Sequence, residues 1–277
     1  MLELTSKEIS AGFSTLGARL LSLRLAGVEL LAGGGSDEEC LAGDWTAGAI
    51  CGRVAGRISF ARFSLDGISY QLAANMGAHQ LHGGPDNFAI RHWTARRMED
   101  SLRFELHSPD GDQGYPGALD ASATYTLAAN VLRLDLEARV TKPTVVNLTN
   151  HAYWNLAGGS RDAFAHELLI DGAHFLPLDE LLLPTGEIRA VKGTRWEFHA
   201  LRPIGEAYDN FWVLSGPRGT MGRALVLRDP ASGRHMEVWT TEAGMQMYTA
   251  EHWNPGFPGK TGPLKQYAAI AIEPQNF

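Results

Sequence analysis

An alternation of apolar and polar residues with a period of two constrains the fold of this chain most strongly. The alternation is fullest over residues 132–140 (LRLDLEARV) and recurs over residues 102–106 (LRFEL). This pattern is typical of a half-buried antiparallel strand. Turn sequences at residues 66–67 (DG) and 229–233 (DPASG) separate other apolar runs and predict hairpins. No stretch has a capped, sustained apolar helix face, so we expect only short connecting helices.

These patterns predict about fifteen or more short strands, too many for one open sheet. The 31 glycines and 13 prolines fit a protein with many turns. A β-sandwich or barrel can hold 277 residues without splitting. We therefore expect a nearly all-β protein, a large antiparallel β-sandwich, with residues 1–277 as a single domain.

Charge and hydropathy exclude several classes of partner. The formal net charge is -7, and the sequence has no lysine or arginine run that could neutralise a nucleic-acid backbone. No apolar run reaches membrane-spanning length, and the first residues (MLELTSKE) lack the features of a signal peptide. The two cysteines, Cys40 and Cys51, do not make a disulfide framework. We therefore expect a cytoplasmic protein that binds neither nucleic acid nor a membrane.

Residues 145–159 (VVNLTNHAYWNLAGG) look like part of a binding or catalytic site. His151 stands there among three asparagines, including Asn150, and two aromatic residues, inside what we interpret as an otherwise apolar strand. An unpaired buried polar group costs roughly 1–3 kcal/mol. These side chains therefore need partners, either within the protein or on a ligand.

Three other segments are ambiguous when taken singly. In residues 52–58 (GRVAGRI), Arg57 is the stronger functional candidate, although turn glycines and solvated arginines explain the segment nearly as well. His82 opens a glycine-rich turn and is either functional or merely exposed. Glu273 follows an apolar run and is either a charged strand end in water or a carboxylate base at the rim of a pocket.

Further candidates have an equally plain structural explanation. Asp209 lies in residues 208–211 (YDNF), where aspartate and asparagine are also common turn formers. Four aromatic residues could form a platform for a saccharide, but we expect them in the core: Tyr115, Trp154, Phe175 and Trp253.

Known cofactor and nucleophile motifs are missing from the sequence. The ten histidines are scattered rather than spaced as metal ligands, and there is no Cys-x-x-Cys. Neither a Gly-x-Ser-x-Gly nor a phosphate-binding glycine loop is present. Acid/base chemistry without a metal or cofactor is what remains.

Seven segments taken together, in order along the chain, resemble the aldose 1-epimerase (galactose mutarotase) family. They are residues 52–58 (GRVAGRI), 81–84 (LHGG), 114–117 (GYPG), 147–156 (NLTNHAYWNL), 183–188 (LPTGEI), 208–211 (YDNF) and 273–275 (EPQ).

The resemblance implies a galactose mutarotase-like supersandwich with a free monosaccharide, a hexose or a pentose, in an open cleft. It implies that Glu273 is the general base and His151 the general acid of ring opening and closure. It also implies roles in hydroxyl binding, chiefly affecting KM, for Arg57, His82 and Asp209, and weaker roles in the same cleft for Asn150 and Gln246.

The sequence departs from the family pattern in three places. Gly56 stands where the family usually has asparagine, and Asn87 stands where glycine is common. We expect these two differences to alter hydroxyl recognition. Family chains also usually continue well beyond the Glu-Pro-Gln segment, so we expect a sheet edge here that lacks its partner.

Two alternatives to a mutarotase stay open. A non-catalytic sugar-binding or sugar-sensing protein on the same fold would keep Arg57 and His82 but would not need Glu273 with His151. An epimerase of phosphorylated sugars would require clustered cations, whereas only Arg53 and Arg57 lie close to a motif. That both the acid and the base positions are filled favours the mutarotase.

Overall fold

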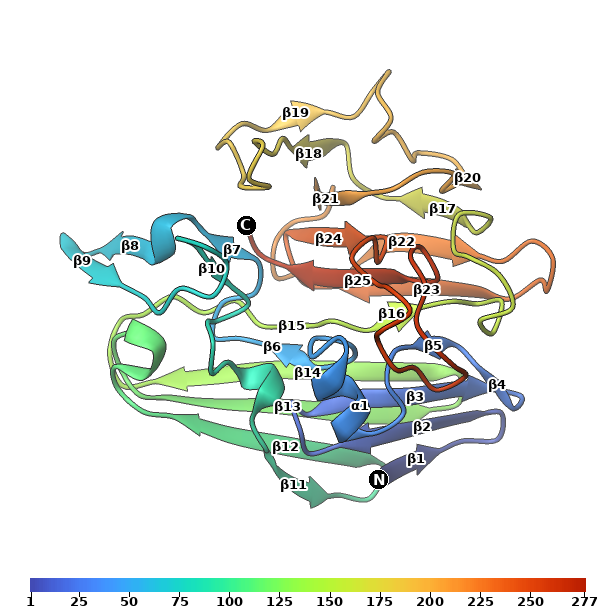
Figure 1. Ribbon diagram of the computed structural model, residues 1–277, viewed down its shortest axis with the longest axis horizontal. Helices are drawn as coiled ribbons and strands as arrows, with labels where there is room; N and C mark the ends of the chain where they lie inside the picture. The colour runs from blue at the N-terminus through green and yellow to red at the C-terminus, as the bar shows by residue number, and fades with distance from the viewer. The chain divides into compact units, whose positions relative to one another are not determined.

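The chain forms two compact, discontinuous units in the computed structural model, which describes residues 1–277. Unit 1 consists of Met1–Gly27 and Gly48–Asn150, and unit 2 consists of Val28–Ala47 and His151–Phe277. Strands dominate both units (Figure 1), which confirms the all-β prediction. The expectation of a single domain over residues 1–277 stays a prediction.

Unit 1 is built around two antiparallel sheets, in the orders β1-β2-β3 and β11-β12-β13-β14. Three strand pairs, β6 with β15, β7 with β10 and β8 with β9, complete the unit. Its strands are β1 (Leu2–Thr5), β2 (Ile9–Ser14), β3 (Arg19–Leu25), β6 (Ile50–Cys51), β7 (Arg57–Ile58), β8 (Arg62–Leu65), β9 (Ile68–Gln71), β10 (Gln80–Leu81), β11 (Thr94–Arg97), β12 (Ser101–Ser108), β13 (Leu119–Ala128), β14 (Val131–Val140) and β15 (Thr149–Asn150), and its 3₁₀ helices are η1 (Ser59–Ala61), η2 (Phe88–Ile90) and η3 (Asp112–Gly114).

Aromatic side chains from both sheets of unit 1 meet in its core. The ring of Phe13 on β2 lies 4.7 Å from that of Tyr125 on β13 and 6.3 Å from that of Phe104 on β12. All three residues are buried. Tilted and edge-on ring contacts of this kind stabilise a core beyond the apolar area that they bury.

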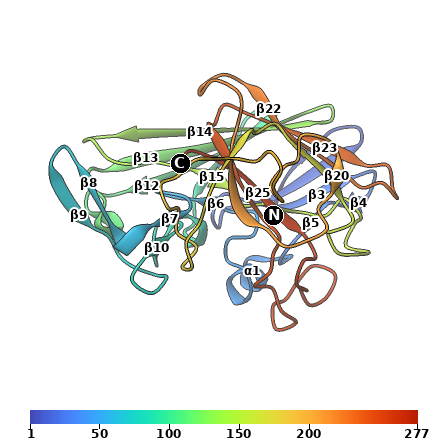
Figure 2. The ribbon, with the colours of Figure 1, turned by 90° about the horizontal axis from the view of Figure 1, so that it is seen from above.

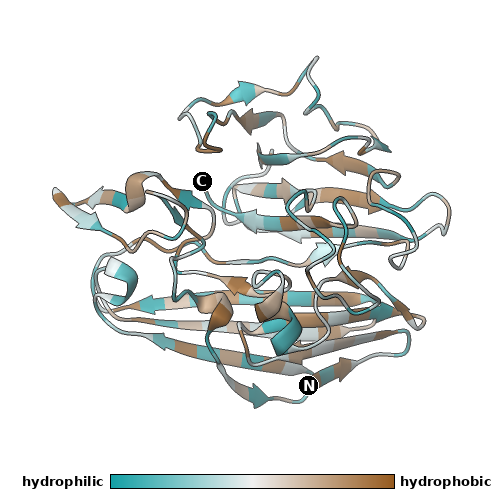
Figure 3. Ribbon diagram, in the orientation of Figure 1, coloured by the Kyte–Doolittle hydropathy of each residue, from teal (hydrophilic) through white to brown (hydrophobic).

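The alternating segments form the predicted strands. Residues 102–106 lie in β12, and residues 132–140 lie in β14, the edge strand of its sheet. Teal and brown alternate along this sheet in Figure 3. Leu134 and Leu136 are half-buried while Arg133 and Glu137 are exposed, as the alternation predicts, but Val140, on the same face as the leucines, is exposed.

Both predicted hairpins are present. β8 and β9 pair from Leu65 opposite Ile68, and the turn residues Asp66 and Gly67 have φ values of 51° and 78°. Positive φ at both turn positions is the requirement of a type I′ turn, which explains the Asp-Gly sequence. In unit 2, residues 229–233 connect β22 to β23.

Unit 2 contains a seven-stranded sheet in the order β19-β18-β21-β24-β25-β16-β5 and a four-stranded sheet in the order β20-β17-β22-β23. Several of these strands are labelled in Figure 1. The strands are β4 (Val28–Glu29), β5 (Leu31–Ala32), β16 (Tyr153–Trp154), β17 (Glu167–Ile170), β18 (His174–Leu176), β19 (Arg189–Ala190), β20 (Arg202–Pro203), β21 (Asp209–Val213), β22 (Gly222–Arg228), β23 (His235–Thr240), β24 (Gly244–Tyr248) and β25 (Ile270–Gln275).

The one α-helix, α1 (Asp37–Ala42), also belongs to unit 2. Ser36 caps it by accepting a hydrogen bond from the backbone N–H of Glu39. Figure 2 shows α1 beside the red loop that precedes β25, and Gly43 lies against Phe257 and Pro258 of that loop. The helix is six residues long, as expected for a short connector.

Two further predictions concern the cysteines and membrane association. Cys40 and Cys51 are both buried thiols. No helix combines the length and the apolar character needed to cross a membrane.

Candidate active site

Glu273 lies inside β25, with β24 on one side and β16 on the other. The apolar run before it continues as a strand through Glu273 to Gln275, so the alternative of a charged strand end in water is wrong. Its carboxylate is buried, with a side-chain exposure of 2%. The strand that carries it is not a sheet edge. A buried carboxylate at the centre of a sheet requires a specific partner.

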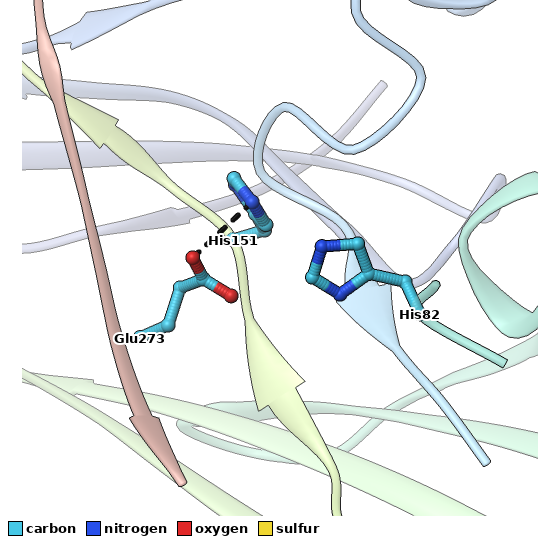
Figure 4. A group of neighbouring side chains, drawn as sticks. All are labelled: His82, His151 and Glu273. Carbon is cyan, nitrogen blue, oxygen red and sulfur yellow. Dashed lines mark ion pairs between the residues drawn. The ribbon is translucent and has the colours of Figure 1, made fainter. Parts of the chain in front are cut away.

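That partner is His151. Its Nε2 lies 3.3 Å from Oε1 of Glu273, and the imidazole is also buried. Figure 4 shows the carboxylate pointing at the ring, with a dashed line for the ion pair. The local backbone differs from the prediction, because residues 145–159 do not form one continuous strand. β15 ends at Asn150 and β16 begins at Tyr153, in a different sheet, so His151 lies at the break between them.

Two more predicted residues lie beside Glu273. Gln246 on β24 is directly opposite Glu273 in the strand register, so both side chains project from the same face of the sheet. Nε2 of Gln246 donates a hydrogen bond of 2.5 Å to Oδ1 of Asp209, the first residue of β21. The carboxylate and the amide are only partly buried. They can therefore both accept from and donate to hydroxyl groups of a polar ligand.

The two faces of β24 differ in polarity and burial. Met245 and Met247 are fully buried on one face, whereas Gln246 and Tyr248 are half-exposed on the other. Successive side chains of a strand point to opposite faces, so the polar face is the one that carries Glu273.

A second buried carboxylate of unit 2, Asp44, is held by several polar contacts. Its Oδ2 accepts a 2.7 Å hydrogen bond from Nε1 of Trp253 and lies 3.3 Å from Nε2 of His252, while its Oδ1 accepts from the backbone N–H of Thr46. Burial by itself raises the pKa of Asp44, but hydrogen bonding to His252 and Thr46, with electrostatic interaction with His151 and His252, brings the pKa well below its usual range. Asp44 is therefore an ionised group at neutral pH.

Tyr153 lies between His151 and Trp253, the indole that donates to Asp44. Its ring lies 5.0 Å from the imidazole of His151 and 4.5 Å from the indole of Trp253. Burial, reinforced by the negative charge of Asp44, raises the pKa of the Tyr153 hydroxyl well above its ordinary value. Tyr153 therefore keeps its proton and serves as packing against one side of the His151 ring.

Replacing Asp44 by asparagine is expected to lower the free energy of unfolding at pH 7 by about 3 kcal/mol, because it breaks a buried charge network. The pKa of Asp44 in the folded protein lies below the unfolded value, which is about 3.9. The stabilisation is therefore complete above about pH 4 and is lost as the pH falls toward the folded value. In urea unfolding, the gap between wild type and Asp44→Asn should narrow from pH 7 to pH 3.

The matched control for this prediction is Asp120→Asn, which changes an exposed carboxylate in a surface pair with His107. Its effect should stay below about 0.5 kcal/mol. If the wild-type and Asp44→Asn stabilities remain parallel down to pH 3, Asp44 does not hold its charge as described.

Arg57 and His82 belong to unit 1 and lie close to each other there. Arg57 on β7 pairs with Leu81 on β10, and the backbone N–H of Gly56 donates to Nδ1 of His82 at 3.3 Å. His82 is buried rather than exposed and has a φ of 50°. The next residue, Gly83, has a φ of 93°, and a Cβ there would lie 1.9 Å from the carbonyl oxygen of Gly52. The glycine is thus required for the turn that holds His82.

Three other polar side chains of unit 1 form hydrogen bonds with groups of the same unit. Asn150 donates to the carbonyl oxygen of Gly48 at 2.7 Å and to the Tyr125 hydroxyl at 3.2 Å. Arg53 is buried and donates to Ser108 Oγ and to nearby carbonyl oxygens, so it organises loops. Asn87, one of the departures from the family pattern, is buried and caps η2 by accepting from the N–H of Ala89.

The aromatic residues proposed either for a platform or for the core are mostly core residues. Tyr115, Phe175 and Trp253 are buried, and Trp154 is half-buried. The expectation of a core position is therefore confirmed for Tyr115, Phe175 and Trp253.

A model of the aldose 1-epimerase family matches residues 1–277 of this chain. The chain belongs to the aldose 1-epimerase family. The galactose mutarotase of Sus scrofa is 40% identical over 240 residues, which are 83% of this chain and 70% of that protein. The aldose 1-epimerase of Escherichia coli (strain K12) is 33% identical over 241 residues, covering 82% of this chain and 69% of the relative.

Solved structures of the aldose 1-epimerase family have the same fold. An aldose epimerase homologue from C. elegans matches with a TM-score of 0.92 and 29% identity, covering 99% of this chain and 88% of that one. A galactose 1-epimerase from Lactobacillus acidophilus matches with a TM-score of 0.87 and 26% identity, with coverages of 99% and 85%. The predicted family, fold and epimerase function are thereby confirmed.

Sequence reasoning missed three polar residues in unit 2 of this family member: Asp44, Tyr248 and His252. Tyr248 follows Gln246 by two positions on the same strand, so the period-two rule would have placed both on one face. Asp44 and His252 carried no such signal, because their partners are distant in sequence.

Proposed function

We propose that this chain interconverts the α and β anomers of a free aldose by opening and closing its ring, with Glu273 as the base and His151 as the acid. The observation that carries this proposal is the buried contact of 3.3 Å between Glu273 Oε1 and His151 Nε2. The C1 hydroxyl and the ring oxygen are attached to the same carbon of the sugar. An acid and a base that serve both oxygens must therefore lie close together, as these two do.

The reaction proceeds by two proton transfers. Glu273 removes the proton of the C1 hydroxyl, the C1–O5 bond breaks as the C1 carbonyl forms, and His151 gives its proton to O5. Rotation about C1–C2 presents the other carbonyl face. His151 then takes the proton back from the O5 hydroxyl, O5 attacks C1, and Glu273 returns its proton to O1. Both groups end as they began, and each is expected to contribute roughly 10²–10⁴-fold.

Hydroxyl-binding groups hold the sugar during this cycle. In unit 2 we assign this role to Asp209 and Gln246, whose carboxylate and amide are joined by a hydrogen bond beside Glu273. In unit 1 we assign it to Arg57 and His82. Positioning of this kind converts a slow reaction in water into one between fixed partners.

The proposal is tested by polarimetry. Freshly dissolved α-D-galactose and α-D-glucose are followed with and without protein, with the spontaneous rate subtracted. The relaxation rate should increase in proportion to protein concentration and should return to the background after heat denaturation. A chain that accelerates neither these hexoses nor arabinose or xylose, yet binds them in calorimetry, is a sugar-binding protein instead.

A further inference from the structure

A second hydrogen-bonded group lies on the site face of unit 2 and consists of Asp44, His252 and Tyr248. His252 Nε2 lies 3.3 Å from Oδ2 of Asp44, and His252 Nδ1 lies 2.8 Å from the hydroxyl of Tyr248. The backbone N–H of His252 also donates to this hydroxyl, at 2.7 Å. The proposed proton transfers use none of these three residues.

Asp44 fixes the orientation of the His252 ring. The carboxylate cannot turn freely, because Trp253 donates to it at 2.7 Å and the backbone N–H of Thr46 donates to it at 2.9 Å. Since an ionised carboxylate only accepts, Nε2 of His252 carries a hydrogen toward Asp44, and Nδ1 is the ring atom that faces the hydroxyl of Tyr248.

This arrangement determines what Tyr248 can offer to a ligand. One lone pair of its oxygen accepts from the His252 backbone, and Nδ1 of His252 occupies a second of the three hydrogen-bonding positions of the hydroxyl. One position on the hydroxyl remains. Burial, together with the negative charges of Asp209, Glu251 and Asp44, raises the pKa of Tyr248, so the phenol keeps its proton. Tyr248 is thus a fixed hydroxyl with one hydrogen-bonding position left for a ligand.

The strand register places Tyr248 on the same face as the predicted catalytic pair. Tyr248 lies two residues beyond Gln246 on β24, opposite Asp209 on β21 and opposite Ala271 on β25. Its ring is 6.5 Å from that of Tyr153, which itself contacts His151. The phenol is half-exposed, unlike the methionines on the other face of β24.

We infer that Tyr248 is a specificity residue whose hydroxyl forms a hydrogen bond with one sugar hydroxyl, and that His252 and Asp44 are the positioning residues that hold it. The inference rests on the proposed function, since it supplies a further contact to the same monosaccharide. It predicts discrimination by the presence or absence of a hydroxyl, because a phenol held in place gains nothing from a sugar that lacks its hydrogen-bonding partner.

Tyr248→Phe is expected to raise KM for galactose or glucose about 3- to 10-fold and to leave kcat within about twofold, because one neutral hydrogen bond to the substrate is lost. The matched control is Tyr267→Phe, which removes a hydroxyl that bonds to Glu251 elsewhere in unit 2. That control should leave KM unchanged. An unchanged KM in Tyr248→Phe overturns the inference.

Variants of His252 separate positioning from general stability. His252→Asn keeps a hydrogen-bonding group near the place of Nδ1 and should leave KM close to the wild-type value. His252→Leu removes that group and should raise KM as much as Tyr248→Phe does, without a further increase in the double variant. Additive effects of the two changes would contradict a role of His252 through Tyr248.

A binding measurement keeps this inference separate from the proposed function. Calorimetric titration with galactose, and with its 2-, 3-, 4- and 6-deoxy analogues, gives Kd for wild type and for Tyr248→Phe. One analogue should bind both proteins equally well, and it identifies the hydroxyl that Tyr248 contacts. If wild type binds sugar without accelerating mutarotation, the proposed function fails while the ratio of Kd values still decides the role of Tyr248. Equal Kd values for every sugar overturn the inference, and absence of binding overturns both.

Discussion

Replacing Glu273 by glutamine is expected to lower kcat for anomer interconversion about 10³-fold while KM changes less than about threefold. Glutamine has nearly the shape of glutamate but cannot take the proton of the C1 hydroxyl. Glu273 is the one carboxylate on β25, and its side chain is buried beside His151. No second carboxylate on this strand can therefore take over as the base. The measurement is the initial polarimetric rate over a range of sugar concentrations, with the spontaneous reaction subtracted.

The control for this variant is Glu237→Gln on β23, where the carboxylate is exposed and accepts from the indole of Trp239. Its kcat and KM should equal those of wild type. Circular dichroism and thermal unfolding show whether Glu273→Gln is folded. A folded Glu273→Gln protein with more than about a tenth of the wild-type kcat would remove Glu273 from the role of base.

The second large effect is expected for His151→Asn, which should lower kcat roughly 10²–10⁴-fold. Asparagine can still donate a hydrogen bond toward Glu273, but it cannot transfer a proton to the ring oxygen. His235→Asn on β23 changes an exposed histidine and serves as the control. A kcat of His151→Asn within tenfold of wild type would mean that another group protonates O5.

The pH profile distinguishes the two roles. Activity requires a carboxylate without its proton and an imidazole with one, so kcat/KM should fall at low pH when the base is protonated and at high pH when the acid is deprotonated. The two apparent pKa values belong to the pair, because the groups are in contact. His151→Asn should lose the high-pH fall and keep the low-pH one. A flat wild-type profile between about pH 5 and 9 would exclude this acid/base pair.

Local sequence patterns predicted the strands well, because they depend on near neighbours. The alternation over residues 132–140 and the Asp-Gly turn after Leu65 each correspond to a strand or hairpin in the structure. The resemblance brought out Glu273 and His151 together although 122 residues separate them. Physical pattern alone marked the segment of His151 as part of a site but left Glu273 ambiguous.

Features that depend on distant contacts could not be predicted in this way. The sequence of residues 145–159 looks like one strand, but its two ends pair with different sheets, and this pairing breaks the strand at His151. The role of Asp44 depends on Trp253 and His252, which approach it only in the folded chain. Its sequence context, Asp-Trp-Thr, is compatible with any surface turn.

The discontinuity of unit 2 has a consequence for the order in which the protein can fold during synthesis. Asp44 leaves the ribosome early, but its partner Trp253 follows 209 residues later, and the interior strand β25 later still. Closing so long a loop is slow and must precede the contacts that reward it. Unit 1 can complete its sheets from residues already made, whereas the segment Val28–Ala47 must wait without its partners. Glu273 and His151, the proposed base and acid, are therefore brought together only after the segment that contains β25 has been made.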